Sequence, residues 1–464
     1  MNRIYIKELN KHTGKEATIK GWVDVRRDQG KMIFFDFRDM SGKVQGVILP
    51  GAKDAHEVGE KVRPEWVVEV KGKINKRPEK MVNKNEENGD IEIEILEIKV
   101  LNEAETPVFD IQSDGHEIGE ENRLKHRYLD LRRPRLQKNI RNRAKVLKFV
   151  RDYLTDENFI EIETPILTKS SPEGARDYVV PSRIEKGKFY ALPQSPQQYK
   201  QLLMVSGMEK YFQLAKVMRD EDTRGDRQPE FTQLDVEMSF VSQEEILNLT
   251  EDMFTKLVKE IYPEKKVTYE PWPRLDYDEV MKEYGTDSPD LRKDKNDPNE
   301  LAFAWILNFP LFEKDKEKGH YAPSHHMFTA PKEEDISKLE SDPSAVRSYQ
   351  HDMVLNGYEV GGGSIRIHDS KVQERIFDLI GFDKKEKEKF SHMLNAFKYG
   401  VPPHGGIAPG MDRLMMVFEN EPNIREVIAF PKTGEGRDLM MDAPSEIDET
   451  QLKELGIKIT KDKK

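Results

Sequence analysis

The stretch Lys216–Glu237 constrains the fold more than any other, because its pattern predicts a strand, a charged loop and a second strand. A long charged loop is ordinarily solvated surface. Here, however, Arg227, Gln228 and Phe231 offer a cation, an amide and a ring face close together. An arginine fork matches phosphate, and an aromatic face stacks on a nucleobase with about 1–3 kcal/mol per base. The pattern predicts a hairpin that holds a nucleotide.

Three charged residues stand where the first of these strands is expected to end: Arg219, Asp220 and Glu221. At that position the sheet, rather than the loop, would fix them. We therefore expect them to contribute to the same nucleotide site.

The composition bounds the class of protein. The 464 residues suffice for two or three domains, and 35% charged against 36% hydrophobic residues describes a polar globular chain. The absence of cysteine excludes disulfides, thiolate metal sites and cysteine nucleophiles. No apolar run reaches the roughly 18 residues of a membrane helix, and the first residues lack a signal-peptide core, so we expect a cytoplasmic protein without a membrane partner. A net charge of −11 argues against a chain wrapped in nucleic acid, but it allows a local basic face that binds RNA.

Short β-rich runs recur in the first part of the chain and predict strands at Ala17–Val25, Met32–Asp39, Lys43–Ile48, Trp66–Ile74 and Ile91–Val100. Five strands at this spacing are typical of a small OB-type barrel. On the second strand, Phe35 and Phe37 share one face and are predicted to fill the barrel, while Phe34 points to the other face. With Arg27 and Gln45 nearby, Phe34 could instead stack on an unpaired base.

A domain boundary is expected in the acidic, loop-like stretch Asn102–Gly119. The basic run Glu121–Asn139 follows, which is either a solvated face or a contact to an RNA backbone. Apolar residues at helical spacing from Ile140 to Leu154 predict a long amphipathic helix, and Phe159–Pro165 predicts a strand that ends at proline. We accordingly predict a barrel at residues 1–103, a hinge at 104–135 and a second domain at 136–464.

Two segments after that strand offer groups for a small charged substrate. Glu173 stands among turn residues, where a carboxylate alone says little. A helix is predicted to begin near Pro196, with Gln197 and Lys200 in its first turn. A lysine there opposes the helix dipole, which favours anions at that end. A lysine aimed at a carboxylate substrate would explain this position.

A further helix is expected at Gln243–Tyr262 and an apolar strand at Ala304–Leu311. His325 and His326 come after that strand. Adjacent residues of a strand point to opposite faces, which disfavours a metal site shared by the two rings.

Strands around a bend are predicted in the region of Asp352, Glu359 and Arg366. The two carboxylates suit a Mg²⁺ ion on triphosphate oxygens, although surface acids are common. An arginine on a strand needs a partner, and a substrate carboxylate would provide one. The glycines Gly361–Gly363 allow close approach but form no P-loop, because no GK[ST] sequence follows. Arg413 is expected in the first turn of a later helix, facing phosphate or an adenine.

In this order, the motifs resemble those of the class II aminoacyl-tRNA synthetases. Arg219-Asp220-Glu221, the charged loop and the strand with Phe231 resemble motif 2 of that class. The sequence DRQPEFTQLDVE resembles the corresponding stretch of the aspartyl enzymes of bacterial type, and Met218 stands where they usually carry Phe. The resemblance covers residues 1–290 and 301–450, and a large domain that bacterial relatives insert is absent near residues 291–300.

The resemblance implies an α+β fold, with an N-terminal OB-fold barrel and a class II catalytic domain on a mostly antiparallel sheet with flanking helices. It implies anticodon contacts at Arg27, Phe34 and Gln45. It implies aspartate contacts at Glu173, Gln197, Lys200, Asp235, His325 and Arg366, with His326 ranked below His325. It implies ATP contacts at Arg219, Asp220, Glu221, Gln228, Phe231, Glu359, Gly410, Met411, Asp412 and Arg413. Of these, Arg219, Glu221 and Arg413 are expected to be catalytic, and Asp352 and Glu359 to hold Mg²⁺.

The implied reaction is the ligation of aspartate to tRNA(Asp) through aspartyl-adenylate, in a homodimer. Whether tRNA(Asn) is also charged stays open at this point. The alternatives are an asparaginyl or lysyl enzyme, which Lys200 and Arg366 disfavour, and a non-catalytic RNA-binding paralogue, which the intact motif residues disfavour. An amide synthetase on the same catalytic fold would leave the barrel without a role.

Overall fold

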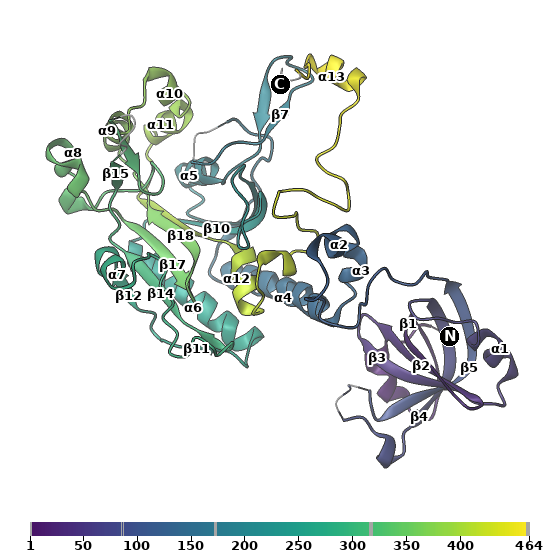
Figure 1. Ribbon diagram of the computed structural model, residues 1–464. Helices are drawn as coiled ribbons and strands as arrows, with labels where there is room; N and C mark the ends of the chain where they lie inside the picture. Colours follow the sequence, from purple (N-terminus) through teal and green to yellow (C-terminus); the bar gives the residue numbers. More distant parts are fainter. Residues whose placement is uncertain (1, 85, 87, 171–173, 315–318, 461–464) are drawn as a thin grey trace. The chain divides into compact units, whose positions relative to one another are not determined.

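The computed structural model describes residues 2–84, 86, 88–170, 174–314 and 319–460. The chain divides into two compact units, Met1–Ile111 and Gln112–Lys464 (Figure 1). Residues 112–135, predicted to be part of a hinge, thus belong to the second unit. No helix in the described part of the chain is long and apolar enough to cross a membrane.

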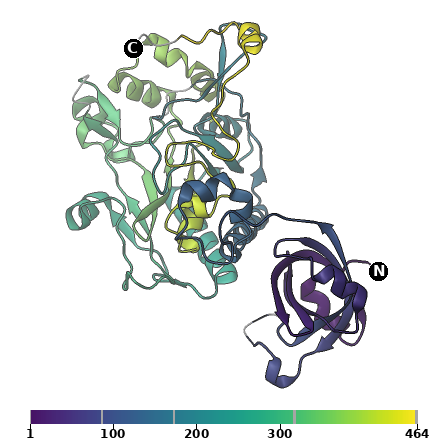
Figure 2. The ribbon, with the colours of Figure 1, turned by 45° about the vertical axis from the view of Figure 1, so that its right-hand side comes forward.

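The first unit is a closed barrel with the strand order β1-β2-β3-β5-β4 (Figure 2). Its strands are β1 (Glu16–Gln29), β2 (Met32–Asp39), β3 (Gly42–Ile48), β4 (Val67–Lys76) and β5 (Ile91–Asn102), with the short helix α1 (Lys53–Gly59) after β3. The five predicted strands are therefore all present. Their alternating apolar residues fill the barrel with a core of its own.

The alternation along β2 separates the three phenylalanines as predicted. Phe35 and Phe37 are fully buried, and their ring centroids lie 5.5 Å apart in the barrel core. Phe34 lies on the opposite, outer face and is half-buried. Arg27 is the partner of Phe34 across β1 and β2, and Gln45 faces the next outward position of β2 across β3. The three residues predicted to contact an anticodon therefore share one outer face of the barrel.

An eight-stranded sheet in the order β12-β14-β17-β18-β19-β10-β9-β6 organises the second unit. All neighbours run antiparallel except β12 with β14 and β6 with β9. The strands are β6 (Ile160–Glu161), β9 (Lys210–Met218), β10 (Glu230–Ser239), β12 (Arg274–Asp276), β14 (Phe303–Leu307), β17 (Gln350–Leu355), β18 (Tyr358–Ile365) and β19 (His404–Pro409). This mostly antiparallel sheet confirms the predicted fold class.

Three helices share one core with the sheet: α4 (Pro134–Asp156), α6 (Gln243–Ile261) and α12 (Met411–Phe418) (Figure 1). The predicted amphipathic helices correspond to α4 and α6. A capping box at Ser242 and Glu245 fixes the start of α6.

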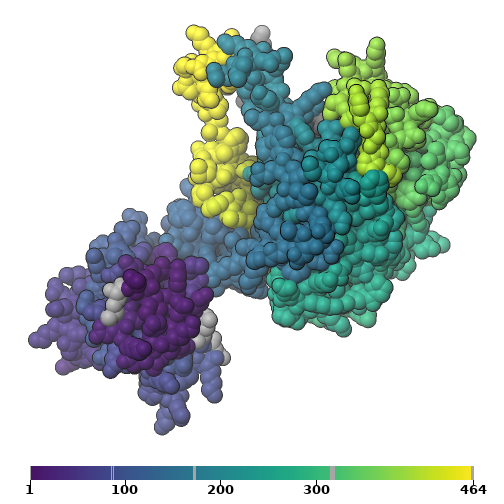
Figure 3. Space-filling view, turned by 180° about the vertical axis from the view of Figure 1, so that it is seen from behind, coloured from purple at the N-terminus to yellow at the C-terminus, as the bar shows by residue number. Residues whose placement is uncertain are grey.

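The remaining helices of the second unit are α2 (Glu120–Lys125), α3 (Arg127–Asp130), α5 (Gln197–Val205), α7 (Tyr277–Tyr284), α8 (Lys338–Ser341), α9 (Ser370–Leu379), α10 (Lys384–Glu388), α11 (Ser391–Phe397) and α13 (Glu449–Leu455). The short strand pairs are β7 (Val179–Pro181) with β8 (Phe189–Ala191), β11 (Lys266–Val267) with β13 (Glu300–Leu301), and β15 (Phe312–Lys314) with β16 (Tyr321–Pro323). The C-terminal helix α13 lies beside the β7–β8 hairpin (Figure 3).

A buried ionic network fixes α2 and α3 within the second unit. Arg123 donates to Glu426 at 2.6 Å and to Asp130 at 3.1 Å, although Glu426 follows it by 303 residues. Arg127 and Arg133 also donate to Asp130, at 2.7 Å each. The basic run at residues 121–139 is therefore in part an internal clamp rather than a solvated face.

Two strands are shorter than the sequence pattern predicted. β14 ends at Leu307 rather than Leu311, because Asn308 adopts a left-handed φ of 60°. β6 comprises only Ile160–Glu161 of the predicted stretch Phe159–Pro165.

Two further residues lie outside the strands to which they were assigned. His325 follows β16, so the opposite-face argument for its neighbour does not apply. Arg366 comes directly after β18 and forms an isolated bridge with Thr329.

Candidate active site

The hairpin at Lys216–Glu237 has the predicted strand–loop–strand form. β9 and β10 pair antiparallel, with Phe231 opposite Val217. The N–H of Arg219 donates to the carbonyl of Pro229 at 2.8 Å, so the pairing continues one step past the strand end. The sheet therefore holds Arg219, as the sequence predicted.

The alternation of β10 explains why one strand serves both the core and a pocket. Leu234 and Val236 point to the helices and are buried in the apolar core. Gln233, Asp235 and Glu237 point to the other face, where they are also buried. The strand thus carries three polar side chains to the face that the helices leave open.

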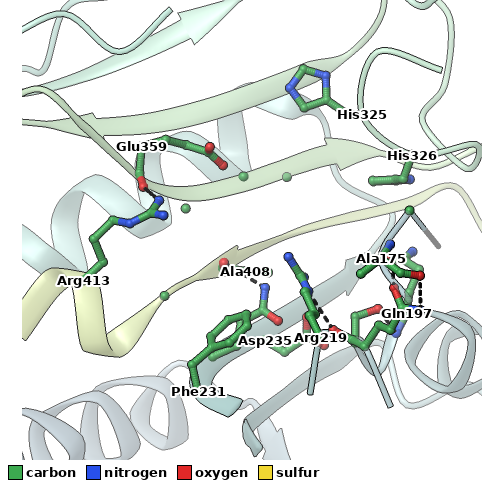
Figure 4. A pocket seen from close by; sticks show the side chains of 18 of the residues that line it. Ala175, Gln197, Arg219, Phe231, Asp235, His325, His326, Glu359, Ala408 and Arg413 are labelled. Carbon is green, nitrogen blue, oxygen red and sulfur yellow. Dashed lines mark hydrogen bonds between the residues drawn. The ribbon is translucent and has the colours of Figure 1, made fainter. Parts of the chain in front are cut away.

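A pocket of about 410 Å³ lies on this face (Figure 4). It brings together residues that lie far apart in the sequence, from α5, the β9–β10 hairpin, β17, β18 and α12. The predicted site residues that line it are Gln197, Lys200, Arg219, Glu221, Gln228, Phe231, Asp235, His325, Glu359, Arg366, Gly410, Asp412 and Arg413.

Four of the residues predicted for the aspartate, ATP and metal sites are not among the lining residues. The side chain of Met411 is completely buried in the apolar core. Asp220 pairs with Arg176 in an isolated bridge. Asp352 contacts two residues that do line the pocket, because its carboxylate accepts from Gln350 and lies 3.3 Å from Nε2 of His325. Glu173 lies outside the described residues.

A buried quartet of charges lies at one wall of the pocket, which Lys200, Asp235 and Arg366 line and to which Glu237 is joined by ion pairs. The Lys200 ammonium lies 2.7 Å from Asp235 and 3.1 Å from Glu237. The Arg366 guanidinium donates to both oxygens of Glu237, at 3.0 and 3.1 Å. All four side chains are at most 2% exposed. Buried ions are tolerated when they are paired in this way.

The partner of Arg366 is Glu237 of the same protein rather than a substrate carboxylate, which corrects the prediction. The sequence suggested that this arginine needs a substrate carboxylate, but Glu237 already engages it through two hydrogen bonds. Burial alone would raise the pKa of Glu237, yet Arg366 and Lys200 outweigh it and lower that pKa to about 2. For Asp235, burial prevails over Lys200 and the pKa is raised. Glu237 lies two residues after Asp235 on β10, so the alternation of the strand places both carboxylates on the same face. This spacing is visible in the sequence, but Glu237 was not among the predicted site residues.

The two histidines have different partners. Nε2 of His325 lies 3.3 Å from Asp352, whose charge outweighs burial and raises the pKa of His325. Nε2 of His326 accepts from Arg366 at 2.8 Å. Burial and that guanidinium hold the pKa of His326 well below its ordinary value, so the ring is neutral. Across the part of the chain that the structure describes, no group of three or more His, Cys, Asp or Glu residues could hold a metal ion.

Charged and aromatic groups meet at the other end of the pocket (Figure 4). The guanidinium of Arg219 lies over the Phe231 ring, 5.2 Å from its centroid. Arg413, in the first turn of α12 as predicted, pairs with Asp226 at 3.1 Å and donates to the carbonyl of Glu359. Cations and a ring face therefore lie within one cavity.

The carboxylate of Asp412 is used within the protein. It accepts from the Thr232 N–H at 2.8 Å and from the guanidinium of Arg143. It thereby joins β10, α4 and α12 beneath the pocket.

Comparisons with known proteins agree for both units. The family described as tRNA synthetases class II (D, K and N) matches residues 119–434, which is more than half of the chain. The chain belongs to this family. The OB-fold nucleic acid binding domain matches residues 17–101 of the synthetase, which correspond to the barrel.

Curated relatives resemble the synthetase over nearly their full lengths. It is 41% identical to aspartate–tRNA(Asp/Asn) ligase of Rubrobacter xylanophilus, covering 97% of this chain and 95% of the relative. It is 40% identical to aspartate–tRNA ligase of Staphylococcus aureus, covering 96% and 97%. The first alignment runs over 572 positions against the 464 residues here, so the relative contains residues without a counterpart in this synthetase.

Solved structures share the fold of the synthetase. Asparaginyl-tRNA synthetase from Pyrococcus horikoshii, complexed with asparaginyl-adenylate, superposes with a TM-score of 0.75 at 22% identity and covers 93% of this chain and 98% of that one. Aspartyl tRNA synthetase from Entamoeba histolytica gives 0.73 at 24% identity, covering 93% and 91%.

Two further residues line the pocket of the synthetase although no sequence motif indicated them. Gln194 is buried, and its amide contacts the backbone of Ala175, which also lines the pocket, and the carboxylate of Asp177. Gln350 contributes from β17. Both are ordinary polar residues in the sequence, and only the fold brings them to the pocket.

Proposed function

We propose that this synthetase is an aspartate–tRNA ligase, which activates L-aspartate with ATP and transfers it to the 3′ end of tRNA(Asp). The observation that carries the proposal is the position of two buried cations, Lys200 and Arg366, on one pocket wall. A side-chain carboxylate gains charge-assisted hydrogen bonds there, whereas an amide gains less and an ammonium is repelled. The names of the curated relatives support the same substrate.

The aspartate would bind between α5 and the strand ends. Gln197 holds the amino acid, and Lys200 and Arg366 meet its side-chain carboxylate. Oδ2 of Asp235 is buried and has no hydrogen-bond partner among the described residues. An ammonium group of the substrate would satisfy this oxygen, and removing such a partner from a buried acceptor costs about 1–3 kcal/mol.

The ATP would bind at the other end of the pocket. Its adenine stacks on Phe231, with Arg413 on the opposite ring face. Arg219 holds the α-phosphate, and Glu221 and Gln228 line the same space. ATP would then replace the acidic partner of Arg413, which is Asp226.

The reaction needs no covalent nucleophile from the protein. The α-carboxylate oxygen of aspartate attacks the α-phosphorus, the bond to the β-phosphate oxygen breaks, and pyrophosphate leaves. The terminal ribose hydroxyl of the tRNA then attacks the acyl carbon, loses its proton, and AMP leaves. The residues act by position and by charge: the pocket aligns the two reactants, and the Arg219 guanidinium stabilises the negative charge on the transferring group.

Mg²⁺ is part of the proposal, through Asp352 and Glu359. A Cβ at Gly362 would lie 3.1 Å from Oδ1 of Asp352 and 3.5 Å from Oε1 of Glu359, so both carboxylates converge on a position that the glycine leaves without a side chain. Carboxylate oxygens are the donors that Mg²⁺ prefers, and the residues fit the ion. When bound, the ion would neutralise charge on the triphosphate.

The barrel would read the tRNA anticodon through the outer face that carries Arg27, Phe34 and Gln45. Relatives named for both tRNA(Asp) and tRNA(Asn) support testing both substrates. The proposal also includes a homodimer, a cytoplasmic location, an aspartate contact by Glu173, and absence of the bacterial insert near residues 291–300.

Aspartate-dependent charging of tRNA(Asp) and tRNA(Asn) transcripts, measured side by side, tests the proposed function. Charging of tRNA(Asp) is expected. Charging of both would define a non-discriminating ligase. No charging and no pyrophosphate exchange with aspartate would refute the proposal, and exchange without charging would refute its tRNA part.

A further inference from the structure

We infer that Gln350 provides a third oxygen ligand for the divalent cation of this site, next to the carboxylates of Asp352 and Glu359. This inference rests on the proposed function, which brings Mg²⁺ to the two acids. It adds a neutral donor from β17 that neither the sequence motifs nor the family resemblance assigned.

The first observation is an incompletely satisfied amide in the pocket wall. The side chain of Gln350 is 2% exposed and belongs to the pocket lining. Its Nε2 donates to Oδ1 of Asp352 at 2.7 Å. Its Oε1 is buried and has no partner among the residues that the structure describes. A buried amide oxygen without a partner is costly, so the site retains it against a free-energy penalty.

The second observation is a space that the amide shares with both carboxylates. The position of a Cβ on Gly362 would lie 3.1 Å from Asp352, 3.4 Å from the amide nitrogen of Gln350 and 3.5 Å from Glu359. These are the nearest atoms to that point. Two carboxylates and one amide therefore converge where the chain has no side chain of its own.

The present orientation of the amide suits a site without a cation. Its N–H group donates to Oδ1 of Asp352 and so offsets part of the charge on that carboxylate. A cation in the shared space would instead be repelled by that N–H group. A half-turn about the last side-chain bond exchanges nitrogen for oxygen, which adds a third ligand to the two acids. Amide and carboxylate oxygens together are ordinary ligands of hard divalent cations.

Mn²⁺ binding to the full chain without nucleotide tests this inference, with free Mn²⁺ measured by electron paramagnetic resonance. Gln350→Met keeps the length of the side chain but removes the amide, and it is expected to weaken Mn²⁺ binding by about tenfold or more. Gln350→Glu adds a charged oxygen and is expected to tighten binding by a similar factor. The two variants change affinity in opposite directions, which a general loss of structure would not do.

The matched control is Gln233→Met on β10. Gln233 lines the same pocket, is similarly buried, and has an Oε1 without a partner among the described residues, but it donates to Ala408 rather than to an acid. Its Mn²⁺ affinity should stay within about twofold of wild type. Asp352→Asn should lose the ion, because a carboxylate ligand is replaced.

Wild-type Mn²⁺ affinity in Gln350→Met, weaker binding in Gln350→Glu, or no Mn²⁺ binding by the wild type would each overturn the inference. Aspartate-dependent ATP–pyrophosphate exchange of the wild type is measured in parallel. If exchange persists while Gln350→Met binds Mn²⁺ normally, only the third ligand is rejected. If the wild type shows no exchange, the proposed function is rejected whatever the Mn²⁺ result.

Discussion

At the scale of single residues, buried charges at the pocket wall occur in pairs of opposite sign that stabilise one another. Lys200, Asp235, Glu237 and Arg366 carry two positive and two negative charges within hydrogen-bond distance of one another. Such a group is stable only as a set, because each ion has lost its water. The cations are thereby held in place before a substrate arrives, which is the arrangement that electrostatic recognition requires.

Replacing Glu237 by Gln should break this set. Arg366 would lose its two charge-assisted bonds, and the pocket wall would gain net positive charge. We expect the second unit to lose about 3–5 kcal/mol of unfolding free energy, measured by calorimetry. Glu185→Gln is the control, because its ion pair with Lys188 is exposed and its loss should change stability by less than about 1 kcal/mol. Equal unfolding free energies for the two variants would contradict the prediction.

Arg219→Ala should abolish adenylate formation and leave tRNA binding intact. In the proposed function the guanidinium would meet the α-phosphate, whereas tRNA would be recognised through the barrel. Losing one such donor typically costs about 10²–10³-fold in rate. The measurement is aspartate-dependent pyrophosphate exchange together with a tRNA filter-binding assay. A wild-type exchange rate in the variant would remove Arg219 from the reaction.

Stability should fall in mild acid because His351 is buried in its neutral form. Burial, and then Arg366, lower its pKa from 6.5 to about 3. The unfolded chain therefore binds a proton between these values that the folded chain excludes, so the unfolding free energy falls as pH drops through this range. The slope is at most about 1.4 kcal/mol per pH unit for one proton. His351→Gln should reduce the slope measured by urea unfolding between about pH 4 and 6 by one proton, and an unchanged slope would contradict this.

At the scale of elements, alternation along strands decides which residues meet in the pocket. β10 gives one face to the helices and the other to the substrates, and β18 runs beside β19 with glycines at Gly361–Gly363. A Cβ on Gly363 would lie 2.2 Å from the carbonyl oxygen of Gly406 and 2.6 Å from His351. The second glycine leaves room for a ligand, while the third lets two strands and a buried histidine pack together.

Gly363→Ala should therefore destabilise the second unit severely, by about 3 kcal/mol or more, because backbone atoms of β19 must move. Soluble yield and the calorimetric transition report this. Gly434→Ala is the matched control, since its Cβ would contact nothing within 4 Å and its change should stay within about 0.5 kcal/mol. A soluble Gly363→Ala protein with wild-type melting would contradict the role of this packing.

Periodicity predicted the elements well and their ends less well. The barrel strands, α4, α6 and the hairpin at Arg219 follow from apolar spacing, which is a local property. The end of β14 depends on the backbone conformation of Asn308, and the two residues of β6 depend on pairing with β9, which are not visible in a local pattern.

For the site, the motif residues were predictable because their chemistry stands out in the sequence. The positions of their partners were not. Strand pairing brings Gln350 to the pocket and Glu237 to the pocket residues Lys200 and Arg366. Asp226 meets Arg413 only when the hairpin lies against α12. The sequence therefore indicated most of the predicted residues that line the pocket, and the fold determined which groups hold them.

At the scale of the whole molecule, the two units separate two tasks. The barrel has its own core and a polar, aromatic outer face, and the second unit contains the whole pocket. Changes to the outer face of the barrel should consequently alter tRNA recognition without altering the activation of aspartate.

Phe34→Ala provides this test. Loss of one stacked base should weaken binding of tRNA(Asp) by about 1–3 kcal/mol, while pyrophosphate exchange stays at the wild-type rate. Met40→Ala is the control, because Met40 is an apolar barrel residue that is 63% exposed and belongs to none of the proposed contacts. Equal tRNA affinities for Phe34→Ala and Met40→Ala would remove Phe34 from the anticodon interface.

The buried ion pair between Arg123 and Glu426 has a consequence for the synthesis of the chain on the ribosome. The barrel can fold once residues up to about 111 have left the ribosome, because all its strands lie within that stretch. The second unit cannot complete the ionic network around α2 and α3 until the segment around Glu426 emerges, 303 residues after Arg123. At 5–20 residues per second this interval lasts on the order of tens of seconds. During it, the buried Arg123 and Arg127 are without their partners at residues 425–429, so nascent chains of this protein should depend on chaperones mainly between these two points of translation.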